Sequence, residues 1–160
     1  MKLKQKKILL IQYIRIFHYI KKLYYHFREI ICFRDFFLEE KSNIYYLKGR
    51  KYLMEDKYRN SLIYLYISYW IRRYLYGQDH HQTIESLGWL VVSEIEMKRY
   101  KKALKLNQKI YEIKKEKIVQ KDMTYYWVLD NFREIYERMS DTQKAVEYFW
   151  QCYDMRHQRK

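Results

Sequence analysis

Residues 86–104 read SLGWLVVSEIEMKRYKKAL, and this stretch decides the fold. Apolar side chains recur three and four positions apart on both sides of a short break at residues 97–99, as they do on the buried face of a helix. Because the break is so short, the two helices must run antiparallel. The stretch therefore predicts a helical hairpin, built on Leu87, Leu90, Val91 and Ile95 before the break and on Ala103, Leu106, Ile110 and Ile113 after it.

The same pattern recurs at an offset of 42 residues. Ser61, Ala103 and Ala145 hold equivalent positions, where a small side chain lets two helices cross closely. Repetition at such a period is typical of stacked helical units. The register predicts hairpins at about 43–75, 82–118 and 123–158, joined by links around 76–81 and 118–122.

Composition supports an all-α chain. Hydrophobic residues make up 49% of its 160 residues, which excludes a disordered tail. There is no proline and there are only three glycines, too few for the many tight turns of a β-sandwich or barrel. We therefore expect long helices joined by short polar connections.

Residues 1–41 differ from residues 42–160, which hold the repeats. Their apolar side chains fall on too many faces for a clean stripe, and ten Lys or Arg stand against four Asp or Glu. We expect a basic helical N-terminal segment or a degenerate cap of the array, such as the second half of a missing repeat. No stretch approaches the roughly 18 apolar residues of a membrane-spanning helix.

The repeats resemble a known family. Leu87-x-x-Leu90 followed by Tyr100-x-x-Ala103 is similar to a tetratricopeptide repeat, and the 42-residue spacing resembles the kinesin light chain subclass. That subclass reads Gly-x-Asp-His-Pro-x-Thr before its first helix, and residues 77–83 read GQDHHQT, with His81 in place of the proline. The resemblance covers roughly residues 43–158, although the third link, residues 119–122, lacks the motif.

The resemblance implies an α–α superhelix of tetratricopeptide-type hairpins, whose first helices line a concave groove for peptides. An asparagine in this groove would grip the ligand backbone, since its amide both donates and accepts. Tryptophans would supply aromatic anchors, unless they only pack between hairpins. The implied peptide-binding residues are Tyr46, Arg50, Glu85, Trp89, Trp127, Asp130, Asn131 and Glu134.

The expected function is a protein–protein interaction scaffold that binds a partner protein or peptide. Acidic groove residues in a chain of net charge +14 favour a ligand with a basic stretch, unless these acids pair with lysines on neighbouring helices. The alternative is a basic helical protein that associates with RNA or an anionic membrane surface through residues such as Lys101, Lys102, Lys105 and Lys109. A lysine-rich solvated exterior explains the same charge.

Enzymatic and metal-binding roles find little support in the sequence. There is no glycine-rich phosphate loop, nucleophile elbow or spaced metal-ligand set. Asp79, His80 and His81 belong to the family-like link, and adjacent histidines seldom bind one ion. Cys32 and Cys152 are too isolated for a disulfide framework or zinc site. We expect no cofactor, no metal, no small-molecule substrate, reduced thiols and a cytoplasmic location.

Overall fold

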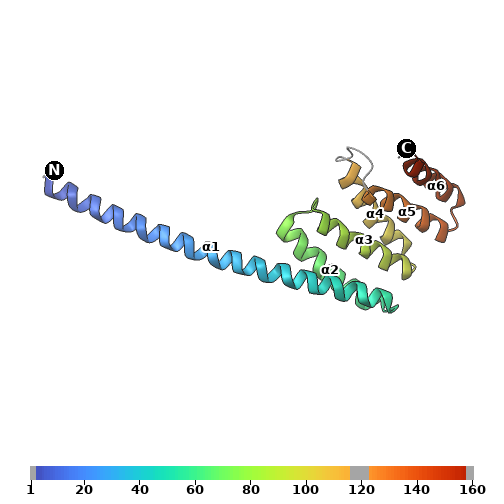
Figure 1. The fold of residues 1–160 in the computed structure, drawn as a ribbon, viewed down its shortest axis with the longest axis horizontal. Helices are drawn as coiled ribbons and strands as arrows, with labels where there is room; N and C mark the ends of the chain where they lie inside the picture. The colour runs from blue at the N-terminus through green and yellow to red at the C-terminus, as the bar shows by residue number, and fades with distance from the viewer. Residues whose placement is uncertain (1–2, 116–122, 158–160) are drawn as a thin grey trace. The chain divides into compact units, whose positions relative to one another are not determined.

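The computed structural model describes residues 3–115 and 123–157, with side chains from His18 onward except that of Ile20. All regular secondary structure in these ranges is helical, which confirms the all-α prediction for them (Figure 1). The link predicted at 118–122 lies outside the described residues. The helices are α1 (Leu3–Met54), α2 (Tyr58–Tyr76), α3 (His81–Glu96), α4 (Tyr100–Lys115), α5 (Met123–Arg138) and α6 (Thr142–His157).

The chain divides into two units, Met1–Leu38 and Glu39–Lys160. In the second unit, successive helices form a helical array: α2 packs on α3, α3 on α4, α4 on α5 and α5 on α6 (Figure 1). Helix α3 also touches α5, so the first helices of neighbouring hairpins meet. The end of α1 packs on α2, where Tyr45 and Tyr52 both stack on Tyr64.

The backbone of the array repeats with the period of the sequence. Asp56, Lys98 and Ser140, each 42 residues apart, have φ angles of 57°, 57° and 62°. After each of them, the next N–H donates back to a carbonyl five residues earlier, and Arg99 to Glu94 is one example at 2.8 Å. A residue with a left-handed backbone conformation, followed by a hydrogen bond to a carbonyl five residues earlier, ends a helix and turns the chain sharply. The three hairpins therefore share one turn geometry.

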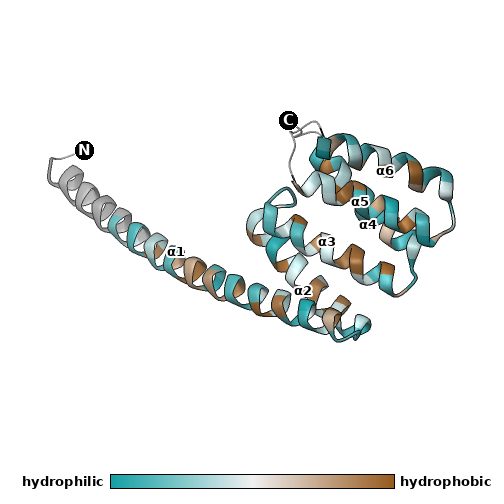
Figure 2. Cartoon of the chain, turned by 45° about the vertical axis from the view of Figure 1, so that its right-hand side comes forward, coloured by the Kyte–Doolittle hydropathy of each residue, from teal (hydrophilic) through white to brown (hydrophobic). Residues whose placement is uncertain are grey.

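The core of the second unit runs through the hairpins. Ala103 is fully buried and Ala145 is 9% exposed. The hydroxyls of Ser61 in α2 and Ser93 in α3 lie 3.0 Å apart, inside the contact between these two helices. Hydrophobic and hydrophilic stretches alternate along these helices (Figure 2). The largest fully buried apolar side chains are Leu65, Ile84, Leu90, Ile95, Ile110, Leu129 and Ile135.

The boundary expected between residues 41 and 42 is not a helix end. Helix α1 continues through it from Leu3 to Met54. Ser42, a residue type that often starts a helix, instead donates its hydroxyl to the Glu39 carbonyl at 2.8 Å, a bond that a serine makes inside a helix. Residues 3–41 are therefore part of the same helix as the beginning of the first hairpin.

In the first unit, the described side chains of α1 are mostly exposed. Large hydrophobic residues share this helix with charged ones, and Figure 2 shows both kinds along its coloured part. No helix in the described ranges is long and apolar enough to cross a membrane. The most exposed large hydrophobic side chains here are Tyr19, Tyr24, Phe27, Phe33 and Phe36.

Candidate functional site

A hydrogen-bonded network joins the expected groove residues of the first two hairpins. The Tyr46 hydroxyl donates to Glu85 Oε1 at 2.6 Å and accepts from Trp89 Nε1 at 2.9 Å. Tyr46 is only 6% exposed, and its burial, with the hydrogen bond to Glu85, raises its pKa. Tyr46 therefore acts as a buried support that fixes Glu85 and Trp89, whose outer parts reach the surface.

Three half-buried side chains from successive first helices form a row. The Arg50 guanidinium lies 4.6 Å from the centre of the Trp89 ring, as a cation–π contact requires. The Trp89 and Trp127 rings meet edge to face, with centroids 6.1 Å apart. Trp127 in turn packs on Gly88, where it fills the space of a side chain. We call these residues the Arg50–Trp89–Trp127 row.

Arg72 is a residue of this region that the sequence reasoning missed. It is 3% exposed, donates to Asn43 Oδ1 at 3.0 Å and to Ser86 Oγ at 2.9 Å, and lies over the Tyr46 ring at 4.2 Å. Burial lowers its pKa, while Glu85 Oε2, 3.6 Å away, favours its charge. A basic residue recurs here at the 42-residue offset, and that was the available signal.

The acidic residues of α5 form ion pairs within their own helix. Asp130 lies 2.8 Å from Arg133, and Glu134 lies 2.9 Å from Arg138. Among the described residues, these partners are thus arginines three and four positions along the same helix. Glu85 is also paired, with the buried Arg72 at 3.6 Å, but 46% of its side-chain surface stays exposed, more than for Asp130 or Glu134.

Asn131 does not lie where a peptide could reach it. It is 3% exposed, and its Nδ2 donates to Asn107 Oδ1 at 3.2 Å. Asn107 in turn donates to the Val128 carbonyl at 2.9 Å. Both amides are therefore used inside the α4–α5 interface, and in this arrangement Asn131 presents no amide to the surface.

The basic residues of α4 point mostly to solvent. Lys101, Lys102 and Lys105 are exposed, whereas Lys109 Nζ donates to the Tyr69 hydroxyl at 2.7 Å. One member of this run is therefore partly structural. The remaining three form a charged surface on α4.

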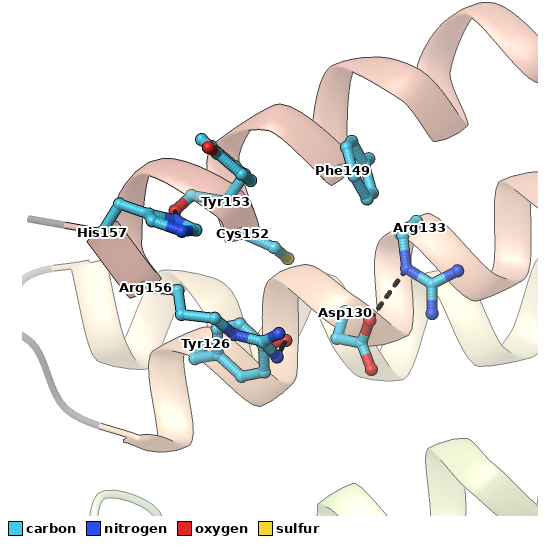
Figure 3. Close-up of a pocket in the computed structure, with 8 residues that line it drawn as sticks. All are labelled: Tyr126, Asp130, Arg133, Phe149, Cys152, Tyr153, Arg156 and His157. Carbon is cyan, nitrogen blue, oxygen red and sulfur yellow. Dashed lines mark hydrogen bonds and ion pairs between the residues drawn. The ribbon is translucent and has the colours of Figure 1, made fainter.

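A cavity of about 340 Å³ opens between α5 and α6 (Figure 3). Cys152 lies at its base, 6% exposed, and burial, helped by Asp130, raises the pKa of its thiol to about 11. No group of three His, Cys, Asp or Glu that could hold a metal occurs among the described residues. The remaining lining residues are Tyr126, Arg133, Phe149, Tyr153, Arg156 and His157.

Neither a protein-family model nor a curated protein matches this sequence.

Proposed function

We propose that this chain is a protein-interaction module of the tetratricopeptide kind, which binds an extended segment of a partner across the first helices of its hairpins. The observation that carries this proposal is the Arg50–Trp89–Trp127 row. It draws one side chain from each of α1, α3 and α5, and each of the three is half-buried. Rigid, partly exposed tryptophans and arginines are the residues that most often dominate binding at protein interfaces.

The chemistry of the row indicates the ligand. A bulky apolar side chain would pack against the two tryptophans, because they offer aromatic area that is already ordered. The Glu85 carboxylate is held by Tyr46 and keeps 46% of its side-chain surface exposed, so it would accept a Lys or Arg beside that anchor. Affinity should be on the order of micromolar, as for modest exposed grooves.

The test is selection of short linear peptides from a random library on the intact chain. The selected peptides should contain a bulky apolar residue near a basic one. Their affinity should fall at least about tenfold for Arg50→Gln and for Trp127→Leu, since truncation of a central anchor typically costs that much. Isothermal titration calorimetry measures each binding constant, and circular dichroism verifies that each variant stays helical.

Trp70→Leu is the matched control. Trp70 is an aromatic residue of α2, 57% exposed, and it lies outside the row. Its replacement should leave the affinity unchanged. Peptides that bind the Arg50 and Trp127 variants as tightly as the wild type, or that are weakened only by Trp70→Leu, would overturn the proposal.

A further inference from the structure

Between residues 19 and 31, helix α1 has an apolar side and a basic side. Successive residues of a helix are rotated by about 100° around its axis, and by this rotation five large hydrophobic side chains fall within an arc of about 120°. Each of the five is between 41% and 66% exposed. An arc of this width is typical of a helix that packs one face against an apolar partner. We call this set the α1 apolar face, and its members are Tyr19, Leu23, Phe27, Ile30 and Ile31.

Basic residues occupy the opposite side of the same segment. By the same rotation, Lys21, Lys22 and Arg28 lie about 120–140° from the centre of the α1 apolar face. All three are exposed, and none of them forms an ion pair with a described residue. Glu29 is the one acidic residue of this segment. The basic side therefore keeps an excess of positive charge beside the apolar face.

The charge of the whole first unit is unbalanced in the same direction. Met1–Leu38 has nine Lys or Arg against two Asp or Glu, a net charge of +7 and thus half of the chain's +14. One of the two acidic residues, Asp35, is already paired with Arg34 at 2.8 Å. A helix with this charge attracts an anionic partner and repels a basic one.

The apolar face and the positive charge together distinguish between possible partners. A second copy of the chain would cover the apolar face, but it would bring the same +7 beside it. Single-stranded RNA matches the charge, but bases stack on planar side chains, whereas Leu23, Ile30 and Ile31 are aliphatic. A bilayer that contains anionic lipid matches both features, because its acyl chains accept aliphatic side chains and its headgroups attract lysine and arginine.

We propose that residues 19–31 of α1 bind the surface of an anionic lipid bilayer, with the helix axis parallel to that surface. The α1 apolar face enters the boundary between headgroups and acyl chains to a depth of about 5–10 Å. Lys21, Lys22 and Arg28 extend to the headgroup phosphates, as long basic side chains do at a membrane surface. This surface belongs to the first unit and the Arg50–Trp89–Trp127 row to the second, so either proposal can fail alone.

The test is co-sedimentation of the intact chain with vesicles of phosphatidylcholine, either alone or with about one-third phosphatidylserine. Half of the protein should bind at about 0.1 mM lipid in the anionic vesicles, the strength of a single reversible anchor, and phosphatidylcholine alone should bind at least about tenfold more weakly. Lys21→Glu with Lys22→Glu should weaken binding to the anionic vesicles at least about tenfold, because it reverses two charges at the headgroups. Leu23→Gln with Ile30→Gln should weaken it at least about tenfold, because two aliphatic side chains are lost from the apolar face.

Each double variant has a matched control in the helical array. Lys101→Glu with Lys102→Glu makes the same change in net charge at two exposed positions of α4. Ile63→Gln with Ile67→Gln removes two aliphatic side chains from α2, where they are 57% and 38% exposed. Both controls should bind the anionic vesicles as the wild type does, and circular dichroism verifies that every variant stays helical.

Several results would overturn the proposal. Equal losses in the α1 and α4 charge variants would show that the net charge of the chain, and not this surface, holds the vesicle. Equal binding to both kinds of vesicle, or no binding to either, would also overturn it. Tighter binding to a single-stranded oligouridylate, lost in Lys21→Glu with Lys22→Glu, would make RNA the partner instead. A dimer in sedimentation that is lost in Leu23→Gln with Ile30→Gln would make a second copy the occupant, against the proposal.

Discussion

Gly88 and Trp127 lie so close that a Cβ on Gly88 would clash with Trp127 Cζ3. Gly88→Ala should therefore destabilise the array by about 1–3 kcal/mol through overpacking, although alanine favours a helix by about 1 kcal/mol over glycine. In a Trp127→Ala background the obstacle is gone, and Gly88→Ala should be neutral or stabilising. Urea unfolding of the four proteins of this double-mutant cycle measures the coupling.

Gly77 provides the control for this cycle. Its φ of +89° disfavours any side chain, yet a Cβ there would meet nothing within 4 Å. Gly77→Ala should therefore destabilise the chain equally with and without Trp127. A Gly88→Ala cost that is likewise independent of Trp127 would show that the ring is not what limits position 88.

Replacement of each of the three left-handed turn residues by glycine should raise the free energy of unfolding. Asp56, Lys98 and Ser140 all have positive φ, a conformation that costs a non-glycine residue roughly 1–2 kcal/mol. Lys98→Gly should therefore raise the free energy of unfolding by up to about 1 kcal/mol, and Lys98→Val should lower it. Chemical denaturation gives both values.

Lys105, exposed in the middle of α4, tests the specificity of that effect. Lys105→Gly should destabilise by about 0.5–1 kcal/mol, because glycine is a poor residue inside a helix. If both glycine variants shift stability in the same direction, the turn geometry is not the cause.

Sequence periodicity located the helices better than it located the site. The break at residues 97–99 lies where α3 ends at Glu96 and α4 begins at Tyr100, because a strong apolar repeat fixes such a break to within a residue or two. Which side of the helix each residue lies on is harder to assign from the sequence. Neighbouring positions on a helix differ by about 100°, so Asp130 can reach the surface while Asn131 is buried.

One further contact could be predicted from the sequence, and another could not. The pairing of Asp130 with Arg133 follows from a spacing of three on a helix, and it needed no structure. The buried role of Arg72 did need one, because nothing in a basic residue at a helix end reveals that it will reach Asn43 and Ser86 in other helices. Long-range polar contacts of this kind depend on tertiary packing.

Alkaline pH should weaken the fold through two half-buried tyrosines, Tyr76 and Tyr125. Burial, followed by hydrogen bonding to Glu39, raises the pKa of Tyr76 to about 12, and burial with the Tyr111 contact does the same for Tyr125. In the unfolded chain, tyrosine hydroxyls ionise near pH 10. The stability that depends on keeping Tyr76 and Tyr125 neutral is therefore fully present below about pH 10 and is lost as the pH rises toward 12. Urea midpoints measured across this window should fall steeply.

Tyr76→Phe should flatten part of that decline, because it removes one group whose ionisation differs between the folded and unfolded states. Tyr25→Phe, at a position 51% exposed in the first unit, should not. Absorbance at the tyrosinate band, followed during the titration, should show the late ionisation directly. A decline of the same slope in all three proteins would contradict the assignment to Tyr76.

The two cysteines should differ sharply in reactivity. A thiol reacts as its thiolate, so the rate depends on both access and pKa. Cys32 is exposed, whereas Cys152 is 6% exposed at the base of the α5–α6 cavity, where burial raises its pKa to about 11. With a disulfide reagent near pH 8, one thiol should react quickly and the other only as α6 opens. In Cys32→Ser only the slow phase should remain, and in Cys152→Ser only the fast phase should remain. In denaturant both thiols should react quickly. Equal rates in the folded chain would show that α6 does not cover Cys152.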